Sequence, residues 1–127
     1  MEKQVIVPEG TDPRDLFIAP AVRVGNLLYL SGSAGIDSKT GQIPGPDIES
    51  QARLALENLG KALIGAGSSW DKVVKVNCYL SNPKRDFPGW NKVWKEYFPQ
   101  NPPARTTVGT FLLNDAWLVE VELVAVV

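Results

Sequence analysis

The spacing of apolar positions along the chain predicts two helices. Between Asp47 and Gly67, apolar residues recur every three or four positions while charged residues occupy the opposite side, which is typical of an amphipathic helix ending at glycine. A second helix is expected over 86–98, where aromatic residues recur at helical spacing, and Pro88 is placed in its first turn. The aromatic stripe is interpreted as core packing against a sheet.

Shorter apolar or alternating runs on either side of these helices predict strands. Two of them are joined by the turn-forming pair Gly25–Asn26. The last two are expected to form a hairpin through a turn at Asn114–Asp115. The predicted strands lie at 3–7, within 20–35, within 68–82, at 104–112 and at 117–126.

The order of the elements predicts an α+β fold in a single domain spanning residues 1–127. Helices separated by single strands favour right-handed crossovers, which give a six-stranded mixed sheet with both helices packed on one face. The opposite face of the last strand carries Glu120 and Glu122 among hydrophobic residues. Such a face is too apolar for open solvent, so another subunit is expected to cover it.

Composition narrows the possible functions. Thirteen Lys and Arg residues against 14 Asp and Glu give a net charge of −1, without the basic stripe typical of nucleic-acid binders. No run of about eighteen apolar residues and no apolar leader is visible, so no membrane partner is expected. The lone Cys78 fits a reducing compartment, and a cytoplasmic protein is expected. Because Cys78 alternates with apolar residues, it is interpreted as a buried, inert thiol.

The chain contains no histidine. This excludes a Ser-His-Asp triad, a Cys-His pair and a histidine-based zinc site. With a single cysteine, thiolate zinc sites are excluded as well. Catalysis would therefore depend on carboxylates, Lys, Arg, Tyr, hydroxyls, backbone amides or water.

Arg105 is the first candidate for a functional side chain. The segment NPPA delivers it to the start of a strand-like run, where it shares a face with Thr107. Its planar guanidinium suits a carboxylate ligand, although an exposed arginine paired with an acidic neighbour is the alternative. In the expected hairpin, Arg105 and Glu120 would lie roughly 13 Å apart along the strands, too far for an ion pair.

Two other segments are candidates. Glu120 and Glu122 either form structural ion pairs at an interface, or one of them orients or deprotonates a water molecule. The segment SGSAG at 31–35 offers backbone N–H groups for an anion or oxyanion. It lacks the glycine patterns of nucleotide-binding loops.

Taken together, these segments resemble the RidA family, also called YjgF/YER057c/UK114. The resemblance covers nearly the whole chain, and its most specific feature is a Pro-Ala-Arg segment followed by a Glu-x-Glu strand. The motifs are AVRVGNLLYLSGSAGID (21–37), TGQIPG (40–45), QARLALENLGKALIGAGSSWDKVVKVNCYL (51–80), FPGWNKVWKEYF (87–98), PPARTTVG (102–109) and LVEVELVAV (118–126).

The resemblance implies a chorismate-mutase-like homotrimer with ligand clefts between subunits. Members hydrolyse reactive 2-imino or 2-enamino acids, released by pyridoxal-phosphate enzymes such as threonine dehydratase, to 2-oxo acids and ammonia, with no cofactor or metal. By position, Arg105 would bind the substrate carboxylate and Glu120 would position the water. Ser31 and the Gly32 amide would line the cleft, opposite the Thr107 backbone.

Three positions depart from the family pattern. Ile18 stands where the family has an active-site tyrosine, although Phe17 is adjacent. Ser33 replaces a usual glutamine, and Thr107 replaces the cysteine of many members. A non-catalytic protein that binds small carboxylates in the same cleft is therefore an alternative. An endoribonuclease fits poorly with the acidic composition and the absence of histidine.

Overall fold

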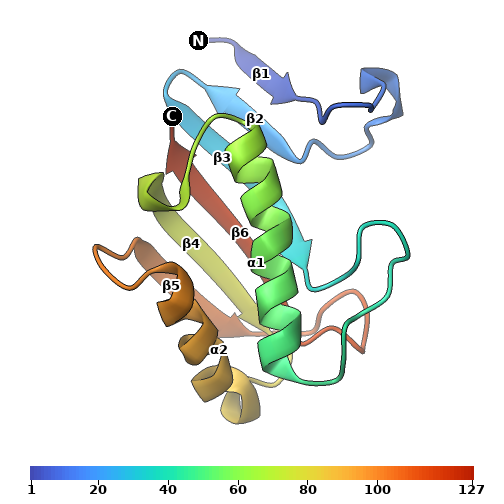
Figure 1. Cartoon of the computed structure of the whole chain (residues 1–127), viewed down its shortest axis with the longest axis vertical. Coiled ribbons are helices and arrows are strands. Elements are labelled where there is room, and N and C mark those ends of the chain that lie inside the picture. The colour runs from blue at the N-terminus through green and yellow to red at the C-terminus, as the bar shows by residue number, and fades with distance from the viewer.

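The computed structural model describes residues 1–127 and contains one six-stranded sheet with two α-helices on one of its faces (Figure 1). The strand order β1-β2-β3-β6-β4-β5 combines antiparallel pairs with one parallel pair, so the fold is α+β with a mixed sheet, as predicted. The elements are β1 (Lys3–Ile6), β2 (Ala21–Val24), β3 (Leu27–Ala34), α1 (Ile48–Gly65), β4 (Val73–Leu80), α2 (Pro83–Tyr97), β5 (Ala104–Gly109) and β6 (Val119–Val126).

The predicted first helix is confirmed. It starts where the side chain of Asp47 accepts a hydrogen bond from the backbone N–H of Ser50 at 2.9 Å. It ends before Gly67, whose φ of 92° lies in the left-handed region that favours glycine. The apolar side of α1 packs on the sheet, where Leu56 and Leu63 are fully buried.

The second helix starts three residues earlier than the predicted range of 86–98. Asn82 caps it by accepting a hydrogen bond from Arg85 N–H at 3.2 Å, and Pro83 occupies the first turn. The prediction that Pro88 lies in the first turn is wrong, because Pro88 is inside the helix. Asn82 supplies the capping side chain, and Pro83 follows at a position where a helix makes no hydrogen bond through its backbone N–H. This pair therefore determines where α2 begins.

The predicted hairpin between the last two strands is also wrong. β5 pairs only with β4, in parallel, and forms an edge of the sheet. β6 lies between β3 and β4 and is antiparallel to both. The physical reason is burial: Val119 and Val121 are completely buried and the alternate positions of β6 are also partly covered, which suits a central strand. The crossover through α2 then places β5 beside β4.

One buried polar side chain fixes the approach to β6. Gln51 on α1 is completely buried, and its amide donates to the carbonyls of Gly45 (2.9 Å) and Ala116 (3.1 Å). Its side-chain oxygen accepts from Leu118 N–H at 2.8 Å. Since a buried amide is stable only when its groups are paired, these bonds hold the chain two residues before Glu120.

No helix of the chain covers the other face of the sheet, as predicted. This face exposes large side chains from several strands, including Tyr29, Val74 and Val108. Glu120 and Glu122 lie on this open face, where the phenol of Tyr79 donates to Glu122 at 2.6 Å. No helix in the chain has the length and apolar character needed to cross a membrane.

Candidate active site

Glu120 lies beside an irregularity in the neighbouring strand. The register of β3 against β6 shifts between Leu30 and Ser33, which makes a β-bulge at Ser31 and Gly32. A Cβ atom placed on Gly32 would be only 3.1 Å from Oε2 of Glu120. The glycine therefore lets the backbone of the bulge approach the carboxylate, and a side chain at position 32 would crowd it.

The two carboxyl groups of β6 have different surroundings. Burial raises the pKa of Glu120, and the negative charge of Glu122 raises it further. Glu122 accepts the hydrogen bond from Tyr79, which raises the pKa of that phenol, whereas no group of the chain donates to Glu120. Glu120 is thus the carboxylate with free acceptor capacity and a strengthened tendency to take a proton.

Arg105 lies on the helix-covered face of β5 and contacts α2. Its Nη1 donates to Oδ1 of Asn91 at 2.8 Å. The centre of its guanidinium is 4.8 Å from the ring centroid of Trp94 and 5.5 Å from that of Phe87. None of the ion pairs in the chain includes Arg105, so the alternative of an acidic intrachain partner is not supported. Its charge stays available for an external anion.

Sequence reasoning missed these three supports of Arg105. Phe87 and Trp94 were part of the aromatic stripe interpreted as core packing, and Trp94 is indeed nearly buried, like Trp90 in the same stripe. The missed signal was Asn91, a polar residue at helical spacing between two aromatic residues that both face a strand.

Arg105 and Glu120 do not meet within one chain. Arg105 is in register with Val76, whose side chain is buried beneath the helices. Glu120 is in register with Tyr79 of the same strand, which belongs to the open face. Because successive side chains of a strand point to opposite faces, the guanidinium and the carboxylate lie on opposite sides of the sheet. The prediction that they form no ion pair within one chain is confirmed, but the reason is their placement on opposite faces and not a distance along a hairpin.

The surroundings of Arg105 and those of Glu120 are two half-sites, and the other predicted site residues are distributed between them. Ser31 joins the Glu120 side, where its hydroxyl donates to the carbonyl of Ala19. Phe17 and Ile18 precede that point, and their side chains are 98% and 65% exposed. Thr107 follows Arg105 on β5, with a buried hydroxyl that lacks a hydrogen-bond partner.

Cys78 is paired in register with Thr107 and is almost completely buried, as predicted. Burial raises the pKa of its thiol to about 11. A thiol with this pKa carries almost no thiolate near neutral pH, so Cys78 is not a nucleophile. The chain brings together no group of three or more His, Cys, Asp or Glu side chains that could hold a metal ion.

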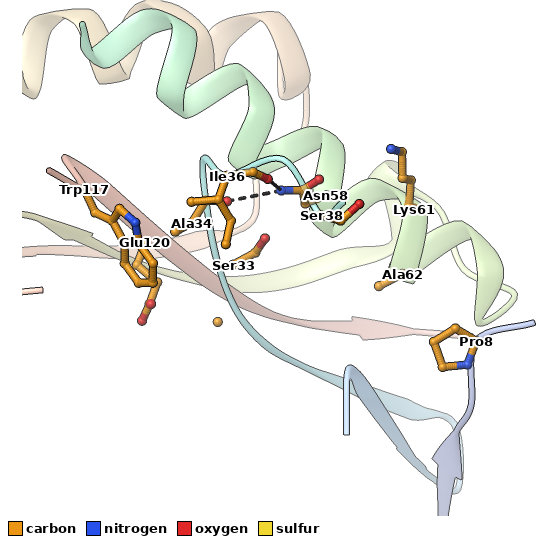
Figure 2. A pocket seen from close by; sticks show the side chains of 11 residues that line it. Pro8, Ser33, Ala34, Ile36, Ser38, Asn58, Lys61, Ala62, Trp117 and Glu120 are labelled. Atoms are coloured by element: carbon orange, nitrogen blue, oxygen red, sulfur yellow. Dashed lines mark hydrogen bonds between the residues drawn. The ribbon is translucent and has the colours of Figure 1, made fainter. Parts of the chain in front are cut away.

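Glu120 is in the wall of two cavities. The first has a volume of about 470 Å³ and runs around the end of β3 from Gly32 toward Lys61 on α1 (Figure 2). Asn58 anchors the strand end there, because its amide donates to the carbonyls of Ala34 (3.2 Å) and Ile36 (2.8 Å). The second cavity, of about 310 Å³, lies toward residues 110–113 and has Glu120 and Glu122 in its wall. A molecule held near Glu120 therefore has room on both sides.

Comparisons with known proteins agree with this architecture. The family model "Endoribonuclease L-PSP" matches residues 12–127. The chain is 35% identical to the 3-aminoacrylate deaminase RutC of Acinetobacter baylyi over 125 residues, covering 98% of each chain. It is also 35% identical to the human 2-iminobutanoate/2-iminopropanoate deaminase over 106 residues, covering 84% of this chain and 77% of the human one.

A solved structure extends the likeness to three dimensions. The Rid-family protein YyfA of Yersinia pestis superposes with a TM-score of 0.85 at 32% identity, covering 99% of this chain and 100% of the other. The superposed region therefore spans both strands that carry Arg105 and Glu120.

Proposed function

The chain belongs to the endoribonuclease L-PSP family, also known as the RidA or YjgF/YER057c/UK114 family, and from that premise we propose that it hydrolyses 2-imino and 2-enamino acids to 2-oxo acids and ammonia. The observation that carries the proposal is the pair of unsatisfied half-sites. Arg105 offers a guanidinium without a carboxylate partner, and Glu120 offers a carboxylate without a donor. A 2-imino acid supplies the carboxylate for Arg105, and the water that attacks its imine carbon supplies the donor for Glu120.

The proposed active unit is a homotrimer. Arg105 and Glu120 lie on opposite faces of one sheet, so both can reach one ligand only if they come from different copies. Contact of the β5 edge of one copy with the open face of the next joins the half-sites. In the proposed trimer this head-to-tail contact closes into a ring after three copies, and it buries exposed apolar residues of the open face such as Tyr29 and Val108. The clefts would then lie between subunits.

The proposed reaction uses only side chains, backbone and water. Arg105 binds the carboxylate of the substrate through parallel hydrogen bonds, which places the imine carbon near Glu120 of the neighbouring copy. Glu120 accepts a proton as the water oxygen bonds to that carbon, and the C=N π pair moves to nitrogen. Return of that proton to nitrogen gives a neutral carbinolamine. Glu120 then takes the hydroxyl proton and passes it to nitrogen as the C–N bond breaks, so that ammonia leaves with the bonding pair and the C=O of the 2-oxo acid forms. The raised pKa of Glu120 favours this exchange of a proton.

The test is a competition for the imine. Threonine dehydratase releases 2-iminobutanoate from threonine, semicarbazide traps it, and the absorbance of the semicarbazone reports what escapes hydrolysis. We expect the wild-type protein to slow semicarbazone formation, and Arg105→Ala and Glu120→Gln to abolish this effect. Arg53→Ala is the matched control, because Arg53 pairs with Glu96 on the exposed helix surface.

One result of the trapping assay would contradict the proposed deaminase activity. An unchanged semicarbazone signal with the wild-type protein, across imines from several amino acids, would exclude deaminase activity. If calorimetry then showed 2-oxobutanoate binding that Arg105→Ala removes, the chain would be a non-catalytic binder of small carboxylates.

A further inference from the structure

The smaller cavity beside Glu120 has an apolar wall that the proposed reaction does not use. Residues 110–113 line it together with Tyr79, and the two carboxylates of β6 complete it. Within this segment, Phe111 is 99% exposed and Leu113 is 95% exposed. Large apolar side chains this exposed, next to a group with a perturbed pKa, are typical of a surface that binds something apolar.

The backbone of this segment is anchored on both sides. Thr110 N–H donates to the carbonyl of Leu80 at 3.0 Å, which continues the parallel pairing of β5 with β4. After the segment, Trp117 N–H donates to the carbonyl of Asn114 at 3.0 Å, and Gln51 holds the carbonyl of Ala116. Phe111 and Leu113 are therefore presented from a backbone whose two ends are fixed, and a ligand that contacts them need not order the loop.

The two cavities beside Glu120 differ in the charged groups that line them. No lysine or arginine lines the smaller cavity, whose only charged groups are Glu120 and Glu122. The larger cavity contains Lys61. A second carboxylate on a substrate would be repelled from the smaller cavity by like charge, whereas a hydrocarbon group would lose only its contact with water.

The position of Glu120 connects this cavity to the substrate. If Glu120 faces the imine carbon on the open face, the group attached to that carbon enters the smaller cavity. The wall of this cavity carries both carboxylates of the open face, whereas the larger cavity runs around the end of β3 to α1. A volume of about 310 Å³ exceeds what a methyl or ethyl group fills and falls in the range of small-molecule sites. Resting on the proposed function, we propose that this chain prefers 2-imino acids with bulky apolar side chains, branched aliphatic or aromatic, and that Phe111 and Leu113 determine the preference.

The first experiment compares substrates with the wild-type protein. An L-amino-acid oxidase generates imines from leucine, phenylalanine, glutamate and arginine, and semicarbazide trapping gives kcat/KM for each beside 2-iminobutanoate. We expect kcat/KM for the leucine and phenylalanine imines to exceed that for 2-iminobutanoate by roughly tenfold or more. Equal values, or faster hydrolysis of the glutamate or arginine imine, would overturn the proposal while leaving deaminase activity established.

Binding gives a readout that does not depend on turnover. Calorimetry with 4-methyl-2-oxopentanoate and 2-oxobutanoate compares the same two side-chain sizes on the stable products. Tighter binding of the larger product is expected whether or not the chain is a deaminase, so failure of the proposed function is distinguishable from failure of this inference. Equal affinity would overturn it.

The second experiment assigns the preference to residues. Phe111→Ala and Leu113→Ala should each reduce kcat/KM for the bulky imines by roughly tenfold and leave 2-iminobutanoate nearly unchanged. Ile64→Ala is the matched control, since Ile64 is an exposed apolar residue on α1. Light scattering accompanies each variant. An unchanged substrate profile together with a smaller assembly would identify the segment as a subunit contact and overturn the assignment.

Discussion

Glu120 and Glu122 occupy alternate positions on one face of β6, yet only one of them is suited to exchange protons. Tyr79 satisfies Glu122 with a hydrogen bond, while Glu120 sits against Gly32 with no donor. The electrostatic role of Glu122 follows from this arrangement: its negative charge adds to burial in raising the pKa of its neighbour. In the proposed reaction, Glu120 is the proton acceptor and Glu122 is the neighbour whose charge raises its pKa.

This division of roles predicts a shift in pH dependence for Glu122→Gln. The proposed reaction needs deprotonated Glu120, so kcat/KM should fall as the pH drops through the pKa of Glu120, which lies above its ordinary value. Removing the charge of Glu122 lowers that pKa, so the acid limb should move to lower pH, while the glutamine oxygen still accepts from Tyr79. The measurement is a pH profile of imine hydrolysis.

The matched control is Glu57→Gln, an exposed carboxylate on α1, which should leave the acid limb in place. An acid limb that stays fixed in Glu122→Gln, or that moves to higher pH, would contradict the assigned role of Glu122.

At the scale of elements, α2 supports Arg105, the arginine proposed to bind the substrate, as well as covering the sheet. Phe87, Asn91 and Trp94 lie along one side of the helix, and all three contact Arg105 on the edge strand β5. The aromatic rings restrict the guanidinium, and the asparagine fixes one of its nitrogens without neutralising its charge. The helix thus orients a cation that the strand alone would leave mobile.

The Asn91 contact predicts a loss in substrate binding rather than in the chemical step. A hydrogen bond to a charged group contributes about 1.5–3 kcal/mol, so Asn91→Ala should raise KM by roughly tenfold or more with little change in kcat. Asn91→Asp should raise KM further, because a carboxylate at this point competes with that of the substrate. Lys92→Ala, an exposed neighbour on α2, serves as the control.

A larger fall in kcat than rise in KM for Asn91→Ala would indicate that Asn91 acts on the reacting atoms. Equal KM values for Asn91→Ala and Asn91→Asp would contradict the proposed competition for the guanidinium.

The sequence predicted the helices and strands better than it predicted which strands lie side by side. Periodicity identifies which residues share a face, and it located both helices and the open face that carries Glu120. It does not identify which strand lies beside which, and a short connection between the last two strands favoured a hairpin that the structure does not contain. The same limit applies to the candidate site. The sequence identified Arg105 and Glu120 as candidates by residue type, but it did not predict that they lie on opposite faces, because this depends on the order of β6, β4 and β5.

At the scale of the whole molecule, the opposite placement of Arg105 and Glu120 predicts complementation between inactive variants. Arg105→Ala and Glu120→Gln chains, unfolded together and refolded as a mixture, should regain activity. In a randomly mixed ring, roughly a quarter of the clefts would receive an intact arginine from one copy and an intact glutamate from the next. Each variant refolded alone is the control and should stay inactive.

Light scattering on the mixture would verify that assemblies formed. A mixture that assembles fully but stays inactive would contradict a cleft shared between copies, because every functional site would then need both residues from one chain.

The two-sided placement of these residues also bears on inheritance. Each copy in the proposed ring lends its guanidinium to the cleft on one side and its carboxylate to the cleft on the other. A chain that folds and assembles but lacks both side chains would therefore inactivate two neighbouring clefts at once. The intact residues that normal chains contribute to those clefts would be inactive as well. In a cell carrying one normal and one such defective allele, the lost activity would exceed the share of defective protein, so the defect would behave as dominant.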